Sequence, residues 1–309
     1  MQAQWKRIAF RNASRSIVRT RAFWRAATPV CKKWSIKMSM RDVILPIKRL
    51  PVPLLTTIAY SAFYTNTAAS ETIRPLSSIR LYQFAPCPYC CKVRAILDYY
   101  KVPYEIVEVN PVTKKELKDI TTYRKVPVCQ IEGDIVTGSS VIVNQIASRV
   151  RSQTGTIDGT ETEWCHWVDT ILIPLLPLNI YRSFSEACDA FEYCLTEGNF
   201  TPLERQVSKY FGAIVMYGVS KRKKKTKGIQ EERQALYDAV NEWIRALDDH
   251  AFLGGDTPNL ADLSVFGVLR SIQSLATFED LKRNTSIVPW YDRMRDVVGS
   301  SAGRPAVST

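Results

Sequence analysis

The sequence predicts an α/β domain followed by an all-helical domain, and three observations carry this prediction. Short apolar strand candidates alternate with amphipathic helix candidates over residues 78–152. A polar, glycine-containing stretch at residues 151–161, RSQTGTIDGTE, is typical of a linker. Beyond it, strand signals vanish and apolar residues recur at helical spacing. We expect the helical domain at residues 160–299 and a disordered tail at residues 300–309.

The order of elements expected in the first domain is β-α-β-α-β-β-α. IRLYQF and YEIVEV have the apolar pattern of strands. Between them, CPYCCKVRAILDYYK repeats its apolar residues at i, i+3, i+4 and i+7, which indicates a helix. A second helix is expected at residues 111–120, with Pro111 near its first turn. VPVCQIEGDIVTGSS then predicts a hairpin, and SSVIVNQIASRV a helix that Ser139 or Ser140 caps.

The second domain is expected to contain six helices, at residues 162–176, 184–196, 203–222, 231–248, 260–276 and 289–298. The clearest apolar stripe consists of Leu203, Val207, Tyr210, Phe211 and Ile214. In PNLADL, Asn259 and Asp262 have the spacing of a capping box. We interpret the basic run KRKKKTKG, residues 221–228, as a solvated loop rather than a lipid or phosphate patch.

The positive charge of the chain is concentrated at its start. The whole chain carries 42 Lys and Arg against 30 Asp and Glu. Residues 1–41 hold eleven of these basic residues and no acid, so the rest is nearly neutral and nucleic-acid binding is not expected. An Arg-rich, Ser-rich and acid-free start is typical of a mitochondrial or plastid transit peptide, and a disordered basic tail is the alternative. We predict a mitochondrial location.

An uncharged stretch at residues 50–70, LPVPLLTTIAYSAFYTNTAAS, is long enough to cross a bilayer. Its prolines and polar residues favour a linker or an interfacial segment over a membrane anchor. Residues 1–77 are therefore interpreted as a transit peptide followed by a linker or weak anchor.

Three cysteines lie within five positions: Cys87, Cys90 and Cys91. Zinc is disfavoured because the chain has no second CxxC and only two histidines, so no metal site is expected. A CxxC between a strand and a helix is instead where the helix dipole stabilises a thiolate. Helical geometry, at about 100° per residue, turns Cys90 inward and Cys91 to the polar side. Cys87 is thus the candidate nucleophile, Cys90 the resolving or supporting thiol, and Cys91 a bystander.

Two further motifs fit a peptide ligand that contains cysteine. Val126-Pro127 precedes a strand, where a cis bond would hold a turn beside the active cysteine. Ser139 and Ser140 lie at a helix start, where N–H groups and hydroxyls hold a carboxylate. Together with Cys87, these residues would bind a molecule such as glutathione.

CPYC, the Val-Pro element and the Ser-Ser helix start resemble the glutaredoxin-like half of the glutathione transferase fold, and PNLADL resembles its helical half. Over residues 78–298, LYQFAPCPYCCKVRAILDY, VPYEIVEVNPV, YRKVPV, NIYRSFSEA and PWYDRM are similar to the membrane-associated type 2 family of prostaglandin E synthases. The expected fold is thus a thioredoxin- or glutaredoxin-like domain followed by a transferase-like C-terminal domain.

The resemblance implies isomerisation of prostaglandin H2, a lipid endoperoxide, to prostaglandin E2, with glutathione and also haem at the same site. It places the motif cysteines on Cys87 and Cys90, and the main-chain glutathione contact on Val126. The Asp-Ser pair of the family falls on Gly138 and Ser139. This chain departs from the family at Gly138, which lacks the acid for the glutathione amine, and at Phe84, which replaces an active-site tyrosine.

Three functions follow as hypotheses. The first is a thiol-dependent isomerase that uses the Cys87 thiolate. The second is a glutaredoxin-like thiol–disulfide oxidoreductase, which CPYC itself favours. The third is a non-catalytic mitochondrial assembly protein that binds glutathione or haem, which the losses at Phe84 and Gly138 favour. Membrane association and a homodimer, common among transferase folds, are open expectations.

Overall fold

The computed structural model describes residues 76, 78–111, 113–151, 159–195 and 201–306. The transit peptide expected in residues 1–41 and the linker or anchor expected at residues 50–70 lie outside these ranges. In the described part of the chain, no helix combines the length and the apolar character that crossing a membrane requires.

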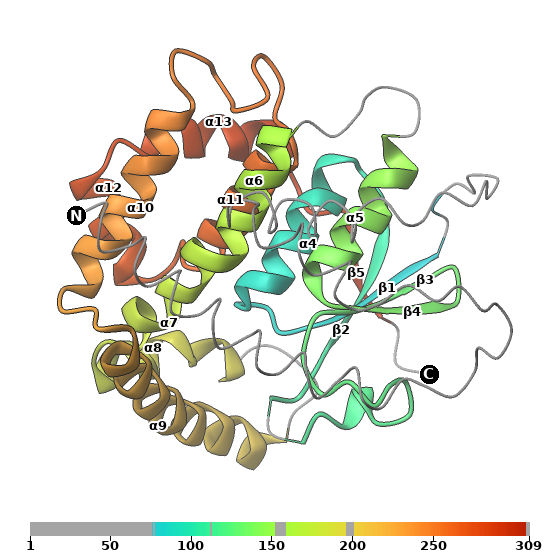
Figure 1. The fold of residues 1–309 in the computed structure, drawn as a ribbon. Helices are drawn as coiled ribbons and strands as arrows, with labels where there is room; N and C mark the ends of the chain where they lie inside the picture. Colours follow the sequence, from blue (N-terminus) through green and yellow to red (C-terminus); the bar gives the residue numbers. More distant parts are fainter. Residues whose placement is uncertain (1–75, 77, 112, 152–158, 196–200, 307–309) are drawn as a thin grey trace, which may run out of the picture. The chain divides into compact units, whose positions relative to one another are not determined.

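A five-stranded mixed sheet forms the centre of the first domain (Figure 1). Its order is β4-β3-β1-β2-β5, with β1 parallel to β2 and antiparallel to β3. Leu81 and Tyr82 point to opposite faces of central strand β1, and both are buried. The strands are β1 (Ile79–Gln83), β2 (Tyr104–Glu108), β3 (Val128–Ile131), β4 (Asp134–Thr137) and β5 (Gly303–Pro305).

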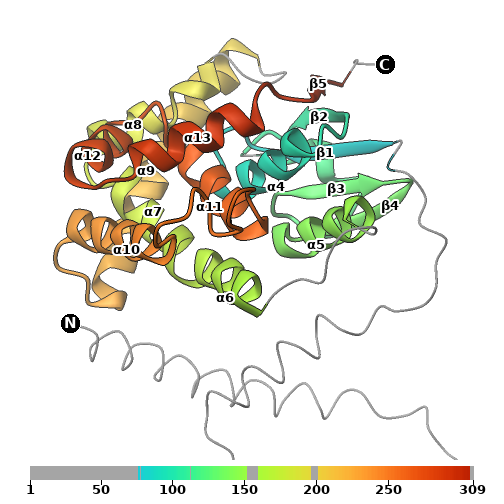
Figure 2. The ribbon, with the colours of Figure 1, turned by 90° about the horizontal axis from the view of Figure 1, so that it is seen from above.

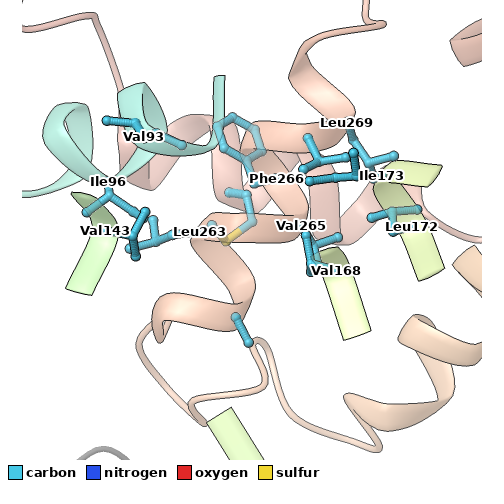
Figure 3. Packing of buried hydrophobic residues seen from close by; sticks show 14 of the residues in the cluster. Val93, Ile96, Val143, Val168, Leu172, Ile173, Leu263, Val265, Phe266 and Leu269 are labelled. Carbon is cyan, nitrogen blue, oxygen red and sulfur yellow. The ribbon is translucent and has the colours of Figure 1, made fainter. Parts of the chain in front are cut away.

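Helix α4 (Pro88–Tyr99) lies between the sheet and helix α11 (Leu260–Arg270) of the second domain (Figure 2). Gly267 permits this close approach, because a Cβ there would lie 2.6 Å from the carbonyl oxygen of Cys91. Side chains of both domains form one buried cluster, in which Ile96 of α4 lies near Leu263 of α11 (Figure 3). The largest hydrophobic cluster therefore extends across both domains.

The remaining helices follow in chain order, and the described part of the second domain is all helical apart from the returning strand β5. Asn259 and Asp262 form the capping box that the sequence predicts at the start of α11. The helices are α5 (Ser139–Val150), α6 (Gly159–Trp167), a π-helical segment η2 (Val168–Leu172), α7 (Ile173–Ile180), α8 (Phe184–Ala190), the 3₁₀ turn η3 (Glu192–Leu195), α9 (Pro202–Lys227), α10 (Glu232–Ala246), α12 (Ala276–Asn284) and α13 (Val288–Val298).

The helix predicted at residues 111–120 is wrong, since only a 3₁₀ turn, η1 (Lys115–Leu117), forms there. The side chain of Asn110 accepts a hydrogen bond from the backbone of Thr113, and the side chain of Glu116 accepts one from the backbone of Asn110. Lys114 has a left-handed conformation with φ 51°. Side-chain to backbone bonds thus compete successfully with a helical ladder.

The basic run at residues 221–228 is also not a loop. Helix α9 continues to Lys227 and ends at Gly228, which has φ 65°. Lysine and arginine are good helix formers, and they interact favourably with the dipole at a helix C-terminus. The apolar stripe earlier in this helix is exposed, with Leu203 at 74% and Phe211 at 56% of their full accessibility.

Within the tail expected to be disordered, residues 300–309, residues 303–305 instead form strand β5, which pairs in parallel with β2 and becomes the edge strand of the sheet. Tyr104 pairs with Gly303 in this register, and a Cβ on Gly303 would lie 2.6 Å from the Tyr104 ring. A free sheet edge offers unpaired N–H and C=O groups, which β5 satisfies. Residues 303–305 thus complete the sheet of the first domain.

Candidate active site

The candidate nucleophile lies in the turn between β1 and α4. Cys87 is the N-cap residue of α4, with extended backbone angles, and Pro88 occupies the first helical position. The Cys87 N–H donates to the Phe84 carbonyl oxygen at 3.0 Å. Cys87 is partly exposed, whereas Cys90 is fully buried. Of the two motif cysteines, Cys87 is therefore the one with solvent-accessible surface.

The two thiols have opposite electrostatic environments. A hydrogen bond from the Cys90 side chain, helped by the Tyr89 and Cys90 backbone N–H groups, lowers the pKa of Cys87 against the opposing effect of burial. Burial raises the pKa of Cys90 well above its ordinary value. This arrangement favours a thiolate on Cys87 and a neutral, hydrogen-bond-donating thiol on Cys90.

The expectation that Cys91 lies on a polar side is wrong. Cys91 is 1% exposed, because α11 covers the face of α4 that the helical pattern assigns to solvent. Its Sγ accepts a hydrogen bond from Arg94 Nη2 at 2.9 Å and donates to the Ala85 carbonyl oxygen at 3.3 Å. Arg94 Nη2 also donates to that oxygen at 2.7 Å. Cys91 therefore belongs to the network that holds the turn before Cys87.

The other side of the same turn is held by Glu108, at the end of β2. The Ala85 N–H donates to Glu108 Oε1 at 2.6 Å, and Gln83 Nε2 donates to Oε2 at 3.2 Å. Sequence reasoning missed Glu108 and Arg94. The only signal in the sequence was the position of Glu108 at the carboxyl end of β2. Because β2 is parallel to β1, this end lies at the same edge of the sheet as the turn that carries Cys87.

The Val126-Pro127 bond is cis, which confirms the sequence expectation. It precedes β3, whose Val128 pairs with Tyr82 of β1. Val126 and Phe84 both pack against the buried cluster of Tyr82, Val109, Leu117 and Val128. The structure thus brings the Val126-Pro127 element beside the turn that carries Cys87.

Ser139 and Ser140 open helix α5, but neither is its cap. Gly138 is the N-cap residue, with φ 87°, and no side chain caps the helix there. Ser139 is buried, while Ser140 Oγ donates to Asp169 Oδ2 at 2.5 Å. The positive φ explains glycine at position 138, since an aspartate there would be strained.

An ion pair missed by sequence reasoning adjoins Ser140. Lys92 Nζ of α4 lies 2.5 Å from Asp169 Oδ1 of η2 and 3.2 Å from Ser140 Oγ. The side chain of Lys92 is 3% exposed and that of Asp169 is 24% exposed. The two residues are 77 positions apart, so no local pattern could have linked them.

The described residues contain no group of three or more His, Cys, Asp or Glu side chains arranged to hold a metal ion. What the site offers is a partly exposed sulfur at a helix start, a cis-proline edge, and a second helix start with an adjacent Lys–Asp pair. These groups suit thiol chemistry on a ligand that carries both a carboxylate and an amine.

Comparisons with known proteins identify a matching domain family and two similar animal proteins. A family model described as "Glutathione S-transferase, N-terminal domain" matches residues 81–154. Prostaglandin E synthase 2 of Danio rerio is 37% identical over 265 residues, which are 70% of each chain. The Mus musculus protein of the same name is 37% identical over 277 residues, 72% of each chain.

Among solved structures, a Ser-to-Cys mutant of poplar glutathione transferase F1 is similar with 15% identity and a TM-score of 0.47, covering 71% of this chain and 93% of the other. The described residues form an α/β thioredoxin-like domain followed by an all-α transferase-like domain. On its similarity to the two animal proteins, the chain belongs to the prostaglandin E synthase 2 family.

Proposed function

We propose that this protein is a glutathione-dependent isomerase that converts prostaglandin H2 into prostaglandin E2 at Cys87. Membership of the prostaglandin E synthase 2 family supports the reaction class. The observation that carries the assignment to Cys87 is its lowered pKa at a helix start, with the Cys90 thiol as hydrogen-bond donor. A thiolate is nucleophilic near neutral pH, whereas a neutral thiol reacts slowly.

In the proposed reaction, Cys87 Sγ attacks one oxygen of the endoperoxide. An S–O bond forms, the weak O–O bond breaks, and the departing oxygen takes a proton and becomes the alcohol. Loss of a proton from the carbon that bears the sulfur-bound oxygen then forms the ketone. The electron pair of the S–O bond returns to Cys87, so no net oxidation or reduction occurs and the product is an isomer.

The residues present fit glutathione. The start of α5 with Ser139 and Ser140 offers donors for a carboxylate, and the cis Val126-Pro127 element lies beside the Cys87 turn. Bound there, glutathione would supply a thiol next to Cys87. The described residues identify no contacts for haem, the second group that the resemblance implies.

A turnover assay with prostaglandin H2 and glutathione tests this function. Cys87→Ser should abolish product formation, because a serine hydroxyl is not ionised near neutral pH. Cys188→Ser is the matched control, since Cys188 is also partly exposed but lies on α8, in a different cluster. Equal turnover by the two variants would remove Cys87 from the mechanism.

A second candidate function is glutaredoxin-like thiol–disulfide exchange, which the Cys90-to-Cys87 hydrogen bond favours. Cys87 would attack the glutathione sulfur of a mixed disulfide and release the other thiol, and Cys90 would then displace glutathione to give a Cys87–Cys90 disulfide. In an assay without free glutathione, Cys90→Ser separates the functions, because only Cys90 can then displace the thiol bound to Cys87, whereas the isomerase step forms no disulfide.

The third candidate, a non-catalytic assembly protein, is supported by Phe84, which brings no hydroxyl to the turn before Cys87. Failure of the purified protein to turn over either substrate, with glutathione still bound, would place this function first. The mitochondrial location, membrane association and homodimer stay predictions, to be tested by cell fractionation and by sedimentation of the purified protein.

A further inference from the structure

The Arg94 side chain carries a charge that no acid neutralises, although much of the side chain is buried. Its Nη2 atom donates to the Ala85 carbonyl oxygen at 2.7 Å and to Cys91 Sγ at 2.9 Å. Among the residues that the structure describes, no carboxylate forms an ion pair with it, and its buried Nε has no hydrogen-bond partner. A charge removed from water is costly without a partner, so this guanidinium favours an anion nearby.

The spacing along α4 explains how this charge reaches the turn that carries Cys87. Cys91 and Arg94 follow Cys87 by four and seven residues, so at 3.6 residues per turn all three fall on one face of the helix. Side chains of a helix lean toward its N-terminus, so Arg94 extends back over Cys91. Its contact with Ala85, two residues before Cys87, confirms this direction. The guanidinium therefore lies against the turn.

Ala85 is held by charged groups at both its N–H and its carbonyl oxygen. The N–H donates to Glu108 Oε1 at 2.6 Å, and the carbonyl oxygen accepts from Arg94. The Cys91 thiol donates to the same carbonyl oxygen at 3.3 Å, so its sulfur is a neutral acceptor for Arg94. Ala85 is thus bonded to Glu108 and Arg94 at separate atoms, and these two charges form no ion pair with each other.

Several side chains act electrostatically on Cys87. A hydrogen bond from the Cys90 side chain is the main cause of the lowered pKa of Cys87, and burial opposes it. The Cys90 and Tyr89 backbone N–H groups and the charge of Arg94 lower this pKa further. Burial raises the pKa of Tyr89 and of Tyr181, which follows α7, so both phenols are neutral near pH 7. Of these side chains, Arg94 alone is positively charged.

The groups near Arg94 on β2 and α4 leave its charge uncompensated. Burial raises the pKa of Tyr104, and the charge of Asp98 raises it further, whereas Arg94 lowers it. The Tyr104 phenol is therefore neutral near pH 7. The Asp98 carboxylate already pairs with Arg270 of α11 at 2.9 Å. An anion on Cys87 would supply the negative charge that Arg94 lacks.

We infer that Arg94 is a positioning residue for the reaction at Cys87: its guanidinium fixes the turn through Ala85 and supplies a positive charge that stabilises the Cys87 thiolate. This inference rests on the proposed role of Cys87 and names a charged group behind its ionisation. In the proposed reaction the thiolate attacks the endoperoxide and forms again when the S–O bond breaks. A fixed cation therefore stabilises the cysteine at the start and at the end of the cycle.

Alkylation of Cys87 by iodoacetamide across a pH series, followed by mass spectrometry, tests the inference without either substrate. Arg94→Met removes the charge at similar volume. The alkylation midpoint should move to higher pH by about half a unit or more, because a nearby positive charge favours the thiolate. Arg94→Lys keeps the charge, though not the planar fork, and should keep the midpoint close to the wild-type value.

Two further variants complete the comparison. Arg94→Gln removes the charge but keeps an N–H donor, and it should raise the midpoint as Arg94→Met does. Both neutral variants should fold, because no acid loses a partner and the Ala85 oxygen keeps the Cys91 thiol as donor. Arg245→Met makes the same change at an exposed position of α10 and should leave the midpoint where it is.

The pH profile of turnover gives a readout that a purely structural role would not move. Arg94→Met should lose prostaglandin H2 turnover near pH 7 and recover it as the pH rises through the displaced midpoint. Neutral variants whose midpoints coincide with the wild-type one, or an Arg94→Lys midpoint displaced as far as theirs, would overturn the inference. A wild-type protein without turnover would instead overturn the isomerase function, and the alkylation midpoints would still decide the role of Arg94.

Discussion

Arg270 on helix α11 donates to the buried carboxylate of Asp98 on helix α4, with 2.9 Å between Nη1 and Oδ2. The other carboxylate oxygen accepts hydrogen bonds from the Tyr104 hydroxyl at 3.0 Å, the Ser301 hydroxyl at 3.1 Å and the Ala302 N–H at 3.1 Å. The Asp98 side chain thereby connects the sheet, the helical domain and the segment that leads into β5.

Replacing Asp98 with Asn should lower the free energy of unfolding by about 3 kcal/mol or more, because Arg270 would keep a charge without its partner. Urea denaturation measures this loss. Asp292→Asn is the matched control, since its ion pair with Arg295 is exposed and should contribute less than about 1 kcal/mol. Similar losses in both variants would contradict a central role for Asp98.

The pH dependence of alkylation should report the environment of Cys87. The rate of reaction with iodoacetamide rises as the thiolate forms, so its midpoint follows the pKa. Because the pKa of Cys87 is lowered, the midpoint should lie below that of N-acetylcysteine. The Cys90 side chain is the main cause of that shift, so Cys90→Ala should move the midpoint to higher pH.

Mass spectrometry of the Cys87 peptide across a pH series gives these midpoints. Cys188→Ala, which removes a thiol outside the motif, should leave the Cys87 midpoint where it is. A Cys90→Ala profile that coincides with the wild-type one would show that the helix start, rather than the second thiol, sets the acidity of Cys87.

Cys91→Val should destabilise the turn before Cys87 rather than remove a reacting group. Valine keeps most of the volume but accepts no hydrogen bond from Arg94. Leaving a largely buried donor without its partner costs about 1–3 kcal/mol, which thermal or urea unfolding can measure. Cys91→Ser, whose hydroxyl accepts and donates as the thiol does, is the control and should cost less. Equal losses would contradict a role for this hydrogen bond.

The comparison of sequence with structure separates local from long-range information. The strand–CPYC–helix unit, the cis Val126-Pro127 bond and the Asn259–Asp262 capping box are encoded by neighbouring residues, and the structure has them as expected. The burial of Cys91 could not be predicted in this way. It depends on α11, which packs on α4 from about 175 positions away through Gly267.

Two further features show the same limit of local sequence information. The contact of Lys92 with Asp169 joins residues 77 positions apart in different domains, and each looks like an ordinary surface charge in its own helix. The apolar stripe of α9 has the spacing of a core face, yet Leu203 and Phe211 are exposed. Periodicity identifies which residues share a helix face, but it does not say what covers that face.

The last prediction concerns Phe84, which is partly exposed in the turn before Cys87 and packs with Val126 against the first-domain cluster. Phe84→Tyr adds one hydroxyl that can donate to an endoperoxide oxygen as negative charge develops there. A neutral hydrogen bond contributes about 0.5–1.5 kcal/mol, so kcat for prostaglandin H2 should rise roughly two- to tenfold.

The affinity for glutathione should stay within about twofold of the wild-type value, because the new hydroxyl acts on the other substrate. Phe184→Tyr makes the same change at an exposed position of α8 and should leave kcat unaltered. Turnover and calorimetry on the two folded variants separate these effects. If kcat does not rise in Phe84→Tyr while glutathione still binds, a missing hydroxyl does not limit turnover. If neither the wild-type protein nor Phe84→Tyr turns over prostaglandin H2, the non-catalytic function is favoured over the isomerase.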